Sequence, residues 1–213
     1  MRIPLASYGK PEIIISTVTL LAMGAFGFFI YPALMAIPAI LLLFVFYFFR
    51  HPARKIPVGN DIILSPADGT VIGIDDAPEP EFVKSDTTKI TIFLSVFNVH
   101  INRAPCPGKV AWLDYKRGKY LVASRPEAST ENERNSIGIN AKDGTGSYRV
   151  MMRQIAGIIA RRIVCDCKVN DEVARGQVVG MIKFGSRTEI FIPKDKVASL
   201  DVKMSDKVTA GET

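Results

Sequence analysis

Residues 13–49 read IIISTVTLLAMGAFGFFIYPALMAIPAILLLFVFYFF and contain no charged side chain. As one helix, this run would be far longer than the roughly 30 Å hydrocarbon core of a bilayer. Tyr31 and Pro32 interrupt it near the middle, and splitting there leaves segments 13–30 and 33–49, each close to the roughly 17–25 residues that a span requires. The sequence therefore predicts a two-helix transmembrane hairpin within residues 1–50. A shallow re-entrant hairpin is the alternative, because Pro32 and Pro38 both disturb helix geometry.

Basic residues flank this hairpin on both sides. Arg2 and Lys10 precede it, and Arg50, Arg54 and Lys55 follow it. Because cytoplasmic flanks carry an excess of Lys and Arg, we expect both ends on the cytoplasmic side of the cell membrane, with the rest of the chain there too. A secretory signal peptide is disfavoured, since its apolar core would be only about 7–15 residues long.

The remaining chain has the mixed charges of an ordinary globular domain. The whole sequence of 213 residues carries 27 Lys and Arg against 21 Asp and Glu, a formal net charge of +6. Basic residues beside a hairpin would be drawn to anionic headgroups. No basic patch is interleaved with stacking aromatic residues, so nucleic acid is not an expected partner.

The three cysteines, Cys106, Cys165 and Cys167, are an odd number in a domain expected in the cytoplasm, and they imply no disulfide framework. Cys165 and Cys167 could offer thiolates to a metal, but no second pair completes a four-ligand site. Their alternation with Ile163 favours buried residues on one face of a strand. We expect no metal.

After a linker at residues 51–60, residues 61–213 read mostly as strands. Short β-branched runs bounded by Gly, Pro, Asp or Asn occupy residues 62–64, 71–74, 90–94, 137–139 and 190–192. Residues 149–162 fit either a helix or two strands broken at Ala156-Gly157. Residues 79–86 and 126–135 are polar and expected as loops, with a short helix possible in the second. The pattern indicates a mainly β, antiparallel domain.

Two stretches of this domain resemble the halves of barrel-sandwich hybrid domains, such as biotinyl and lipoyl carriers. They are LSPADGTV at residues 64–71 and VNDEVARGQVVG at residues 169–180. We expect Gly69 and Gly176 to supply positive φ in their turns. The predicted fold is thus mainly β, with a barrel-sandwich-hybrid-like domain after the N-terminal hairpin.

A family resemblance emerges at Phe184-Gly185-Ser186, which precedes an apolar strand ending at Pro193. This stretch resembles the self-cleavage site of pyruvoyl-dependent phosphatidylserine decarboxylases. Further family-like motifs follow the family's order: PADG at residues 66–69, FNVHINRAP at 97–105, ENERN at 131–135 and QIAG at 154–157. With the hairpin and the modest length, the chain resembles the compact bacterial and archaeal branch.

The resemblance implies self-processing at the Gly185–Ser186 bond. The Ser186 hydroxyl would attack the Gly185 carbonyl, which has no side chain to block the approach, and an ester would replace the amide. Elimination would then release a β chain of residues 1–185 and leave a dehydroalanine, which hydrolyses to a pyruvoyl group and ammonia. The α chain of residues 186–213 would begin with this cofactor.

The implied reaction is the decarboxylation of phosphatidylserine, or of archaetidylserine, to the ethanolamine lipid. The pyruvoyl carbonyl would condense with the substrate amine, and the resulting Schiff base would accept the electrons freed when the carboxylate leaves as CO₂. The expected partners are the serine lipid and the two cleaved chains, and the family suggests a homodimer.

Two further residues are candidates for proton transfer. His100 ends an apolar run, and its imidazole can move a proton at Ser186 or at the carbon that loses CO₂. Asp68 could orient His100 or activate Ser186 directly, although an Asp in such a turn also caps its own backbone. Longer family members resemble His-x-Val-His here, and Phe97 stands at the first of these histidine positions. The proton donor for decarboxylation is therefore His100, another acid or water.

Arg103 is the candidate substrate contact, because its guanidinium can hold a carboxylate or phosphate bidentately. The alternative is a structural pair with Glu131 or Glu133.

Two other functions stay open. A non-catalytic carrier or adaptor would need a modifiable lysine at a hairpin tip, whereas Lys183 stands inside an expected strand. A membrane-tethered serine hydrolase using Ser186, His100 and Asp68 would keep an intact chain. Only the decarboxylase splits itself.

Overall fold

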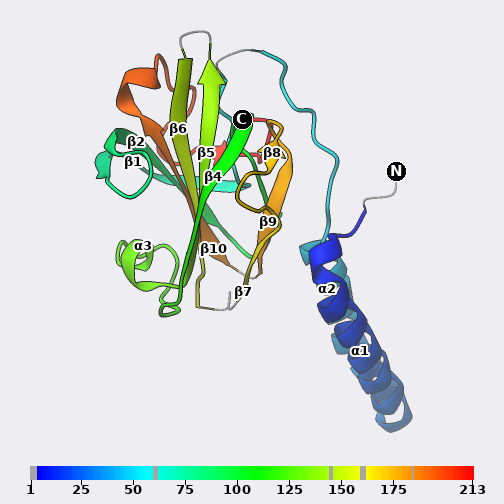
Figure 1. Cartoon of the computed structure of the whole chain (residues 1–213). Helices are drawn as coiled ribbons and strands as arrows, with labels where there is room; N and C mark the ends of the chain where they lie inside the picture. Colours follow the sequence, from blue (N-terminus) through cyan, green and yellow to red (C-terminus); the bar gives the residue numbers. More distant parts are fainter. Residues whose placement is uncertain (1–3, 60–61, 144–145, 159–161, 184) are drawn as a thin grey trace. The chain divides into compact units, whose positions relative to one another are not determined.

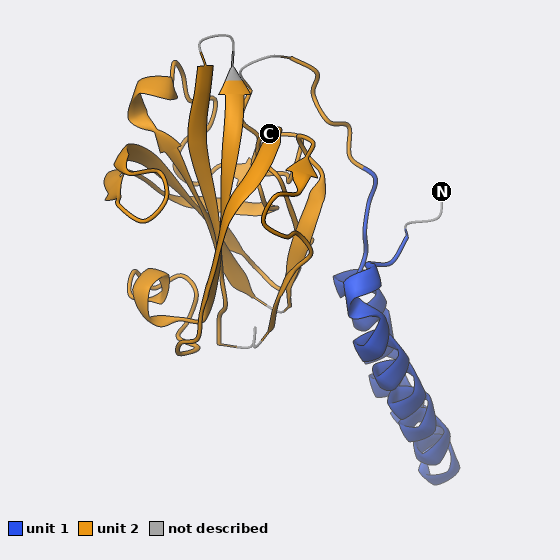
Figure 2. Cartoon of the chain, viewed as in Figure 1, with its two compact units in different colours: residues 1–53 blue, residues 54–213 orange. Residues whose placement is uncertain are grey.

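The protein is represented by a computed structural model, which describes residues 4–59, 62–143, 146–158, 162–183 and 185–213. The chain forms two compact units, Met1–Ala53 and Arg54–Thr213 (Figure 2). The first is helical and the second is nearly all β (Figure 1). This confirms the predicted combination of a β-rich domain with an N-terminal helical hairpin. The division at Arg54 assigns part of the predicted linker to the second unit.

The first unit is a helical hairpin. It consists of the 3-10 turn η1 (Ser7–Gly9), α1 (Lys10–Ile30), the 3-10 turn η2 (Pro32–Met35) and α2 (Ala36–Phe48). α1 begins earlier than expected because Pro11 lies in the first turn, where the backbone N–H has no intrahelical acceptor. The chain is extended at Tyr31, with φ −157°, and this breaks the helix at the predicted point.

Small residues let the two helices pack closely. A Cβ placed on Gly27 would lie 3.3 Å from Cβ of Leu34, and one on Gly24 would lie 3.5 Å from Cγ of Pro38. An antiparallel bridge between Leu5 and Arg50 joins the two ends of the hairpin. Close packing through glycine is typical of helices paired in lipid.

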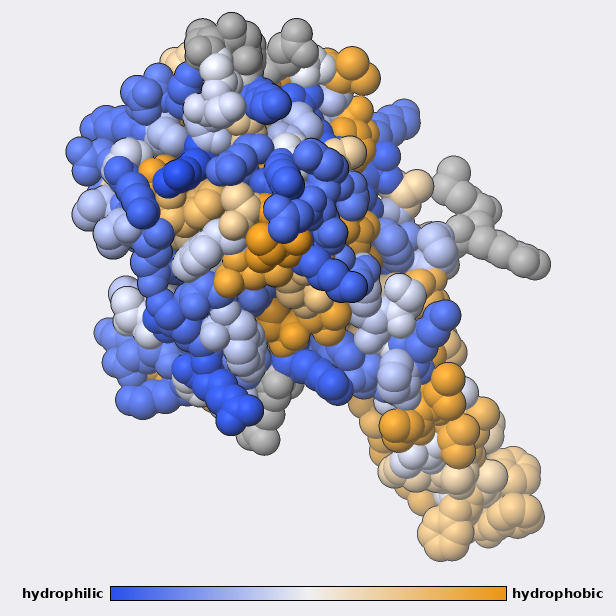
Figure 3. Space-filling model, in the orientation of Figure 1, coloured by the Kyte–Doolittle hydropathy of each residue, from blue (hydrophilic) through white to orange (hydrophobic). Residues whose placement is uncertain are grey.

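The outer surface of the hairpin is apolar (Figure 3). Phe29, for example, is 86% exposed. Other exposed apolar side chains are Ile14, Ile15, Val18, Leu21, Phe26, Ile37, Ile40 and Leu43. The segment Ser7–Ile30 is long and apolar enough to cross a membrane, whereas Pro32–Phe48 is shorter. An exposed apolar surface of this kind marks a site of contact with a membrane or with another protein.

The second unit contains an eight-stranded antiparallel sheet that curls into a half-barrel (Figure 1). In spatial order its strands are β11 (Lys207–Val208), β1 (Gly69–Glu79), β2 (Ser85–Leu94), β10 (Ser186–Pro193), β6 (Gly146–Ile155), β5 (Arg134–Asp143), β4 (Gly108–Lys116) and β8 (Glu172–Val173). A three-stranded sheet contains β3 (Ile101–Arg103), β9 (Val178–Lys183) and β7 (Arg162–Cys165). The short helices of this unit are α3 (Ala128–Glu131) and the 3-10 turn η3 (Lys194–Lys196).

Strand β10 separates two environments because its side chains alternate between the faces of the sheet. Ile190 and Ile192 join the main apolar core inside the half-barrel. Phe191 belongs to a second cluster with Phe82 and Met151. By the same alternation, Ser186 lies on the core side and Arg187 on the opposite side.

Most of the predicted strands are confirmed. The runs at residues 71–74, 90–94, 137–139 and 190–192 lie within β1, β2, β5 and β10. The ambiguous segment 149–162 is extended, with β6 ending at Ile155 and β7 beginning at Arg162. Residues 62–64 are not a strand. They line an apolar cavity of about 350 Å³ between the core and the C-terminal segment.

The two expected loops are shorter than predicted. Pairing of Glu79 with Ser85 extends β1 and β2 into the first, and α3 with the start of β5 occupies the second.

The two barrel-sandwich motifs both form backbone hydrogen bonds with the segment at Arg103 and Ala104. The Arg103 N–H donates to Pro66 O at 3.0 Å, and the Ala104 N–H donates to Gln177 O at 2.8 Å. Gly176 has the expected positive φ, at 72°. Gly69 does not, and that expectation was wrong. A glycine is required at position 69 for another reason, because a Cβ there would lie 2.3 Å from the Phe93 carbonyl oxygen.

Candidate active site

The Gly185–Ser186 bond lies where the chain passes from one sheet to the other. Strand β9 of the three-stranded sheet ends at Lys183, and β10 of the large sheet begins at Ser186. Gly185 has φ 57°, in the left-handed region that favours glycine. Phe184, the first residue of the motif, is outside the described residues. The bond therefore follows a residue whose backbone conformation other amino acids rarely adopt.

His100 contacts the backbone of this junction. Its side chain is fully buried, and its Nε2 accepts a hydrogen bond of 3.1 Å from the Gly185 N–H. Its Nδ1 lies 3.0 Å from the Asn98 carbonyl oxygen. A carbonyl can only accept, so Nδ1 carries the proton and the lone pair of Nε2 faces the Gly185 segment. His100 is therefore a neutral imidazole with its basic nitrogen at the junction.

The backbone holds His100 in this place. The His100 carbonyl accepts the Ile182 N–H at 3.1 Å, and Ile101 next to it pairs with Met181 of β9. The imidazole and the Gly185 segment are thus fixed to the same pair of strands. The structure in this way brings together residues that are 85 positions apart in the sequence.

The Gly185 carbonyl lies against Gly157. A Cβ added to Gly157 would be 2.2 Å from the Gly185 oxygen, and 3.2 Å from Cβ of Ala123. Real Cβ atoms do not approach a backbone oxygen so closely, so only glycine fits here. Gly157 belongs to the QIAG motif, for which the sequence suggested no role. A close approach to a backbone oxygen leaves no sequence signal other than the glycine itself.

The Ser186 hydroxyl is buried without a hydrogen bond to the described part of the chain. Leaving such a group unpaired costs about 1–3 kcal/mol, so buried hydroxyls are normally satisfied. The hydroxyl follows directly after the Gly185 carbonyl. An unpaired oxygen beside a glycine carbonyl is free to turn toward it.

Asp68 lies in an ionic cluster. Its Oδ2 and Oδ1 accept from Arg54 Nη2 at 2.7 and 2.9 Å, and Oδ1 also accepts the Ala210 N–H at 2.9 Å. Arg54 is 3.6 Å from Glu212, so the cluster joins the start of the second unit to the C-terminal segment. Asp68 is therefore part of an ionic cluster, and its part in cleavage stays a prediction.

Arg103 belongs to the same neighbourhood. It donates to the Gly176 carbonyl at 2.7 Å, and burial, together with repulsion by Arg54, lowers the pKa of its guanidinium, while Asp68 and Glu212 oppose that shift. The expected alternative partners lie elsewhere, since Glu131 pairs with Lys119 and Glu133 accepts from Tyr120. Arg103 thus lies near Asp68 and contacts the turn at Gly176, and its part in substrate binding stays a prediction.

Comparison with known proteins assigns the family. A family model described as phosphatidylserine decarboxylase matches residues 41–213. A phosphatidylserine decarboxylase proenzyme of Syntrophus aciditrophicus is 44% identical over 211 residues, covering 98% of this chain and 95% of that protein. The proenzyme of Carboxydothermus hydrogenoformans is 47% identical over 174 residues, covering 82% and 79%. The chain belongs to the phosphatidylserine decarboxylase family.

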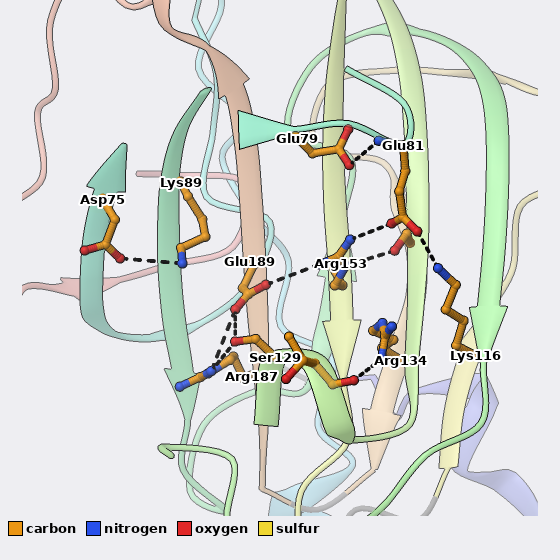
Figure 4. A network of polar contacts seen from close by, with 12 residues as sticks. Asp75, Glu79, Glu81, Lys89, Lys116, Ser129, Arg134, Arg153, Arg187 and Glu189 are labelled. Atoms are coloured by element: carbon orange, nitrogen blue, oxygen red, sulfur yellow. Dashed lines mark hydrogen bonds and ion pairs between the residues drawn. The ribbon is translucent and has the colours of Figure 1, made fainter. Parts of the chain in front are cut away.

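Beside Ser186, this family member has a buried charged pair that sequence reasoning missed. Arg187 and Glu189 are 4% and 1% exposed, and they lie 3.7 Å apart on the outer face of β10. Ser129 of α3 donates to Glu189 at 2.5 Å and accepts from Arg187 at 2.6 Å (Figure 4). Burial lowers the pKa of the Arg187 guanidinium. The available signal was the position of two charged residues in the polar first half of a strand that ends in the apolar run at residues 190–193.

Arg187 borders an open cavity of about 290 Å³. Its guanidinium points from β10 toward β2, on the side where Lys89 and Asp75 lie (Figure 4). The cavity is lined by Ile72, Gly73, Asp75, Lys89, Thr91, Ser124, Pro126, Ser129 and Arg187. The Arg187 Nε is buried without a partner among the described residues. The chain thus has a pocket with charges of both signs next to the second residue of the expected α chain.

Proposed function

We propose that this protein is a self-cleaving, pyruvoyl-dependent decarboxylase that converts a phosphatidylserine-type lipid to the ethanolamine lipid and CO₂. The observation that carries the proposal is the junction itself, where an unpaired Ser186 hydroxyl follows a positive-φ Gly185 whose N–H contacts the basic nitrogen of His100. Relatives named as proenzymes support cleavage.

The residues of the junction have distinct parts in cleavage. In the structure His100 Nε2 accepts the Gly185 N–H, and in cleavage it exchanges this contact for the Ser186 hydroxyl, whose proton it takes as the oxygen attacks the Gly185 carbonyl carbon. Gly157 leaves room for the carbonyl oxygen, because a Cβ there would lie 2.2 Å from it. Asp68 assists His100 in this scheme, as the sequence pattern suggests. Its contacts with Arg54 and Ala210 make a purely structural role the competing assignment.

Ser186 fits the origin of a pyruvoyl group. Its Cα becomes the reactive carbonyl carbon and lies in the strand between the core and the cavity beside Arg187. The group supplies a carbonyl that condenses with the substrate amine and draws electrons from the bond that loses CO₂. The surrounding protein excludes water, because Ser186 and Thr188 are fully buried.

The cavity beside Arg187 is the proposed headgroup site. Lys89 and Arg187 suit the carboxylate and phosphate of a phosphoserine headgroup. The apolar hairpin supports membrane attachment, and its basic flanks support a cytoplasmic active site at the cell membrane. A homodimer remains a family-based expectation.

Intact-mass measurement of the purified chain tests the proposal. We expect two polypeptides, one ending at Gly185 and one whose first residue is a pyruvoyl group in place of Ser186. The preparation should release CO₂ from phosphatidylserine in mixed micelles. Ser186→Ala is the matched control and should give one uncut, inactive chain. A full-length wild-type chain that still decarboxylates the lipid would overturn the mechanism, and an uncut chain with a reactive serine would favour a hydrolase.

Replacing Lys89 tests the headgroup site. Lys89→Gln should mature normally and lower kcat/KM for the lipid by roughly 10–100-fold, because a charge-assisted hydrogen bond contributes about 1.5–3 kcal/mol. Lys194→Gln is the control, since Lys194 pairs with Asp76 as Lys89 pairs with Asp75, but it does not line the cavity. Equal kinetics for the two variants would remove Lys89 from the site.

A further inference from the structure

Cys165 and Cys167 form a close pair of thiols. Their Sγ atoms are 3.4 Å apart, and Cys165 Sγ also contacts the Cys167 carbonyl oxygen at 3.7 Å. Cys165 ends the edge strand β7 and is half-buried, whereas Cys167 is 8% exposed. Residues two apart in an extended chain lie on one side, and here their side chains also converge. Cys165 is therefore the more exposed residue of the pair, and its sulfur lies within hydrogen-bonding distance of the Cys167 sulfur.

The two thiols are electrostatically unequal. The hydrogen bond from Cys167 lowers the pKa of Cys165 to about 6 despite partial burial, and a hydrogen bond from the Asn135 side chain adds to this effect. The pKa of Cys167 is raised by the neighbouring Cys165 and by burial. Cys165 is thus the more acidic thiol of the pair, and the thiolate is the reactive form of a cysteine.

A chain of side-chain amides fixes the Asn135 donor. Asn135 Nδ2 donates to Gln154 Oε1 at 2.9 Å, Gln154 Nε2 donates to Asn102 Oδ1 at 3.0 Å, and Asn102 Nδ2 donates to Thr188 Oγ1 at 3.1 Å. Each amide has its orientation set by the next, so the second Asn135 N–H is left for Cys165. The chain ends on β10, two residues after Ser186.

We propose that Cys165 and Cys167 form a thiol–disulfide exchange site that reacts with low-molecular-weight disulfides such as glutathione disulfide. The Cys165 thiolate attacks one sulfur of the disulfide, a mixed disulfide forms, and one thiolate leaves. Cys167 then loses its proton to that thiolate or to water and attacks the Cys165 sulfur. The second thiol is released, so the dithiol is oxidised to an intramolecular disulfide and the reagent is reduced to two thiols.

Peptide mass analysis of the full-length protein in detergent tests this exchange. After treatment with glutathione disulfide, acid quenching, denaturation and alkylation, tryptic peptide 163–168 should have lost two hydrogens and resist alkylation. Cys106 is the internal control on peptide 104–109, because it is 1% exposed and burial raises the pKa of its thiol to about 12. It should remain a thiol and be alkylated after denaturation.

Two variants distinguish the roles. Cys167→Ser should accumulate one glutathionyl group on Cys165, and Cys165→Ser should leave Cys167 as a thiol. The proposal is overturned if peptide 163–168 stays as reduced as Cys106, or if Cys165→Ser reacts as fast as the wild type. Neither readout depends on self-cleavage or on lipid turnover.

The pH dependence of alkylation gives a second measurement. With its pKa lowered to about 6, Cys165 should be alkylated at nearly the same rate at pH 8 and pH 7, and more slowly only as the pH approaches 6. An ordinary thiol, with a pKa near 8.5, loses most of its reactivity over the first of these intervals. Cys167→Ser weakens the donor and should move the Cys165 profile to higher pH. An ordinary profile in the wild type would contradict the assignment of Cys165 as the attacking sulfur.

Discussion

We expect the His100→Ala protein to remain a single chain under conditions in which the wild type is fully cut. The imidazole is buried, and its Nε2 contacts the Gly185 N–H, so no solvent base replaces it at the junction. General-base catalysis contributes roughly 10²–10⁴ in rate, and cleavage should slow by that factor. Denaturing electrophoresis over time measures it, with Ser186→Ala as the uncut reference.

A conservative variant separates proton transfer from positioning. His100→Gln can still accept the Gly185 hydrogen bond through its amide oxygen, but it cannot take up a proton. It should be as slow as His100→Ala. If His100→Gln is cut at the wild-type rate, His100 only holds the junction in place. If His100→Ala is fully cut and fully active, His100 is a packed residue without a catalytic part.

The role of Asp68 is decided by comparison with its ion-pair partner. Asp68→Asn removes the carboxylate charge, whereas Arg54→Gln removes the guanidinium and leaves the carboxylate in place. If Asp68 assists His100, as we propose, Asp68→Asn should be cut much more slowly than Arg54→Gln. Equal rates would assign Asp68 to the ionic cluster alone.

The second large effect is expected at Gly157. A methyl group in Gly157→Ala would lie 2.2 Å from the Gly185 carbonyl oxygen, so the carbonyl or the neighbouring segment must shift. A displacement of about 1 Å at a reacting group can cost 10²-fold in rate. We therefore expect self-cleavage to slow by about 100-fold or more. The half-time for appearance of the two chains is the measurement.

Gly73→Ala is the matched control for this substitution. The nearest neighbours of its new methyl group are side-chain atoms of Asp75 and Thr91 at 3.2–3.3 Å, about 1 Å farther away than the Gly185 oxygen is at Gly157. That variant should be cut at close to the wild-type rate. Circular dichroism should confirm that both variants fold. A folded Gly157→Ala protein that matures normally would show that the position of the Gly185 carbonyl does not limit cleavage.

The local sequence was sufficient for the main elements. A charge-free run with Tyr31-Pro32 at its centre determines the hairpin, because a long apolar segment without charges is stable only in lipid or in a core. The β-branched runs determine β2, β5 and β10. The cleavage candidate could also be found locally, since Gly185 and Ser186 are adjacent and the chemistry needs a hydroxyl beside an unhindered carbonyl.

Tertiary structure decided which groups surround that bond. The hydrogen bond from Gly185 to His100 and the approach of Gly185 to Gly157 join residues far apart in the sequence, and only the pairing of strands sets such distances. The sequence pattern likewise left several partners open for Arg103. Its contact with Gly176 forms because the distant motifs at residues 64–71 and 169–180 both bind the segment that contains Arg103. Local sequence specifies which groups a residue carries, whereas long-range packing specifies which groups it meets.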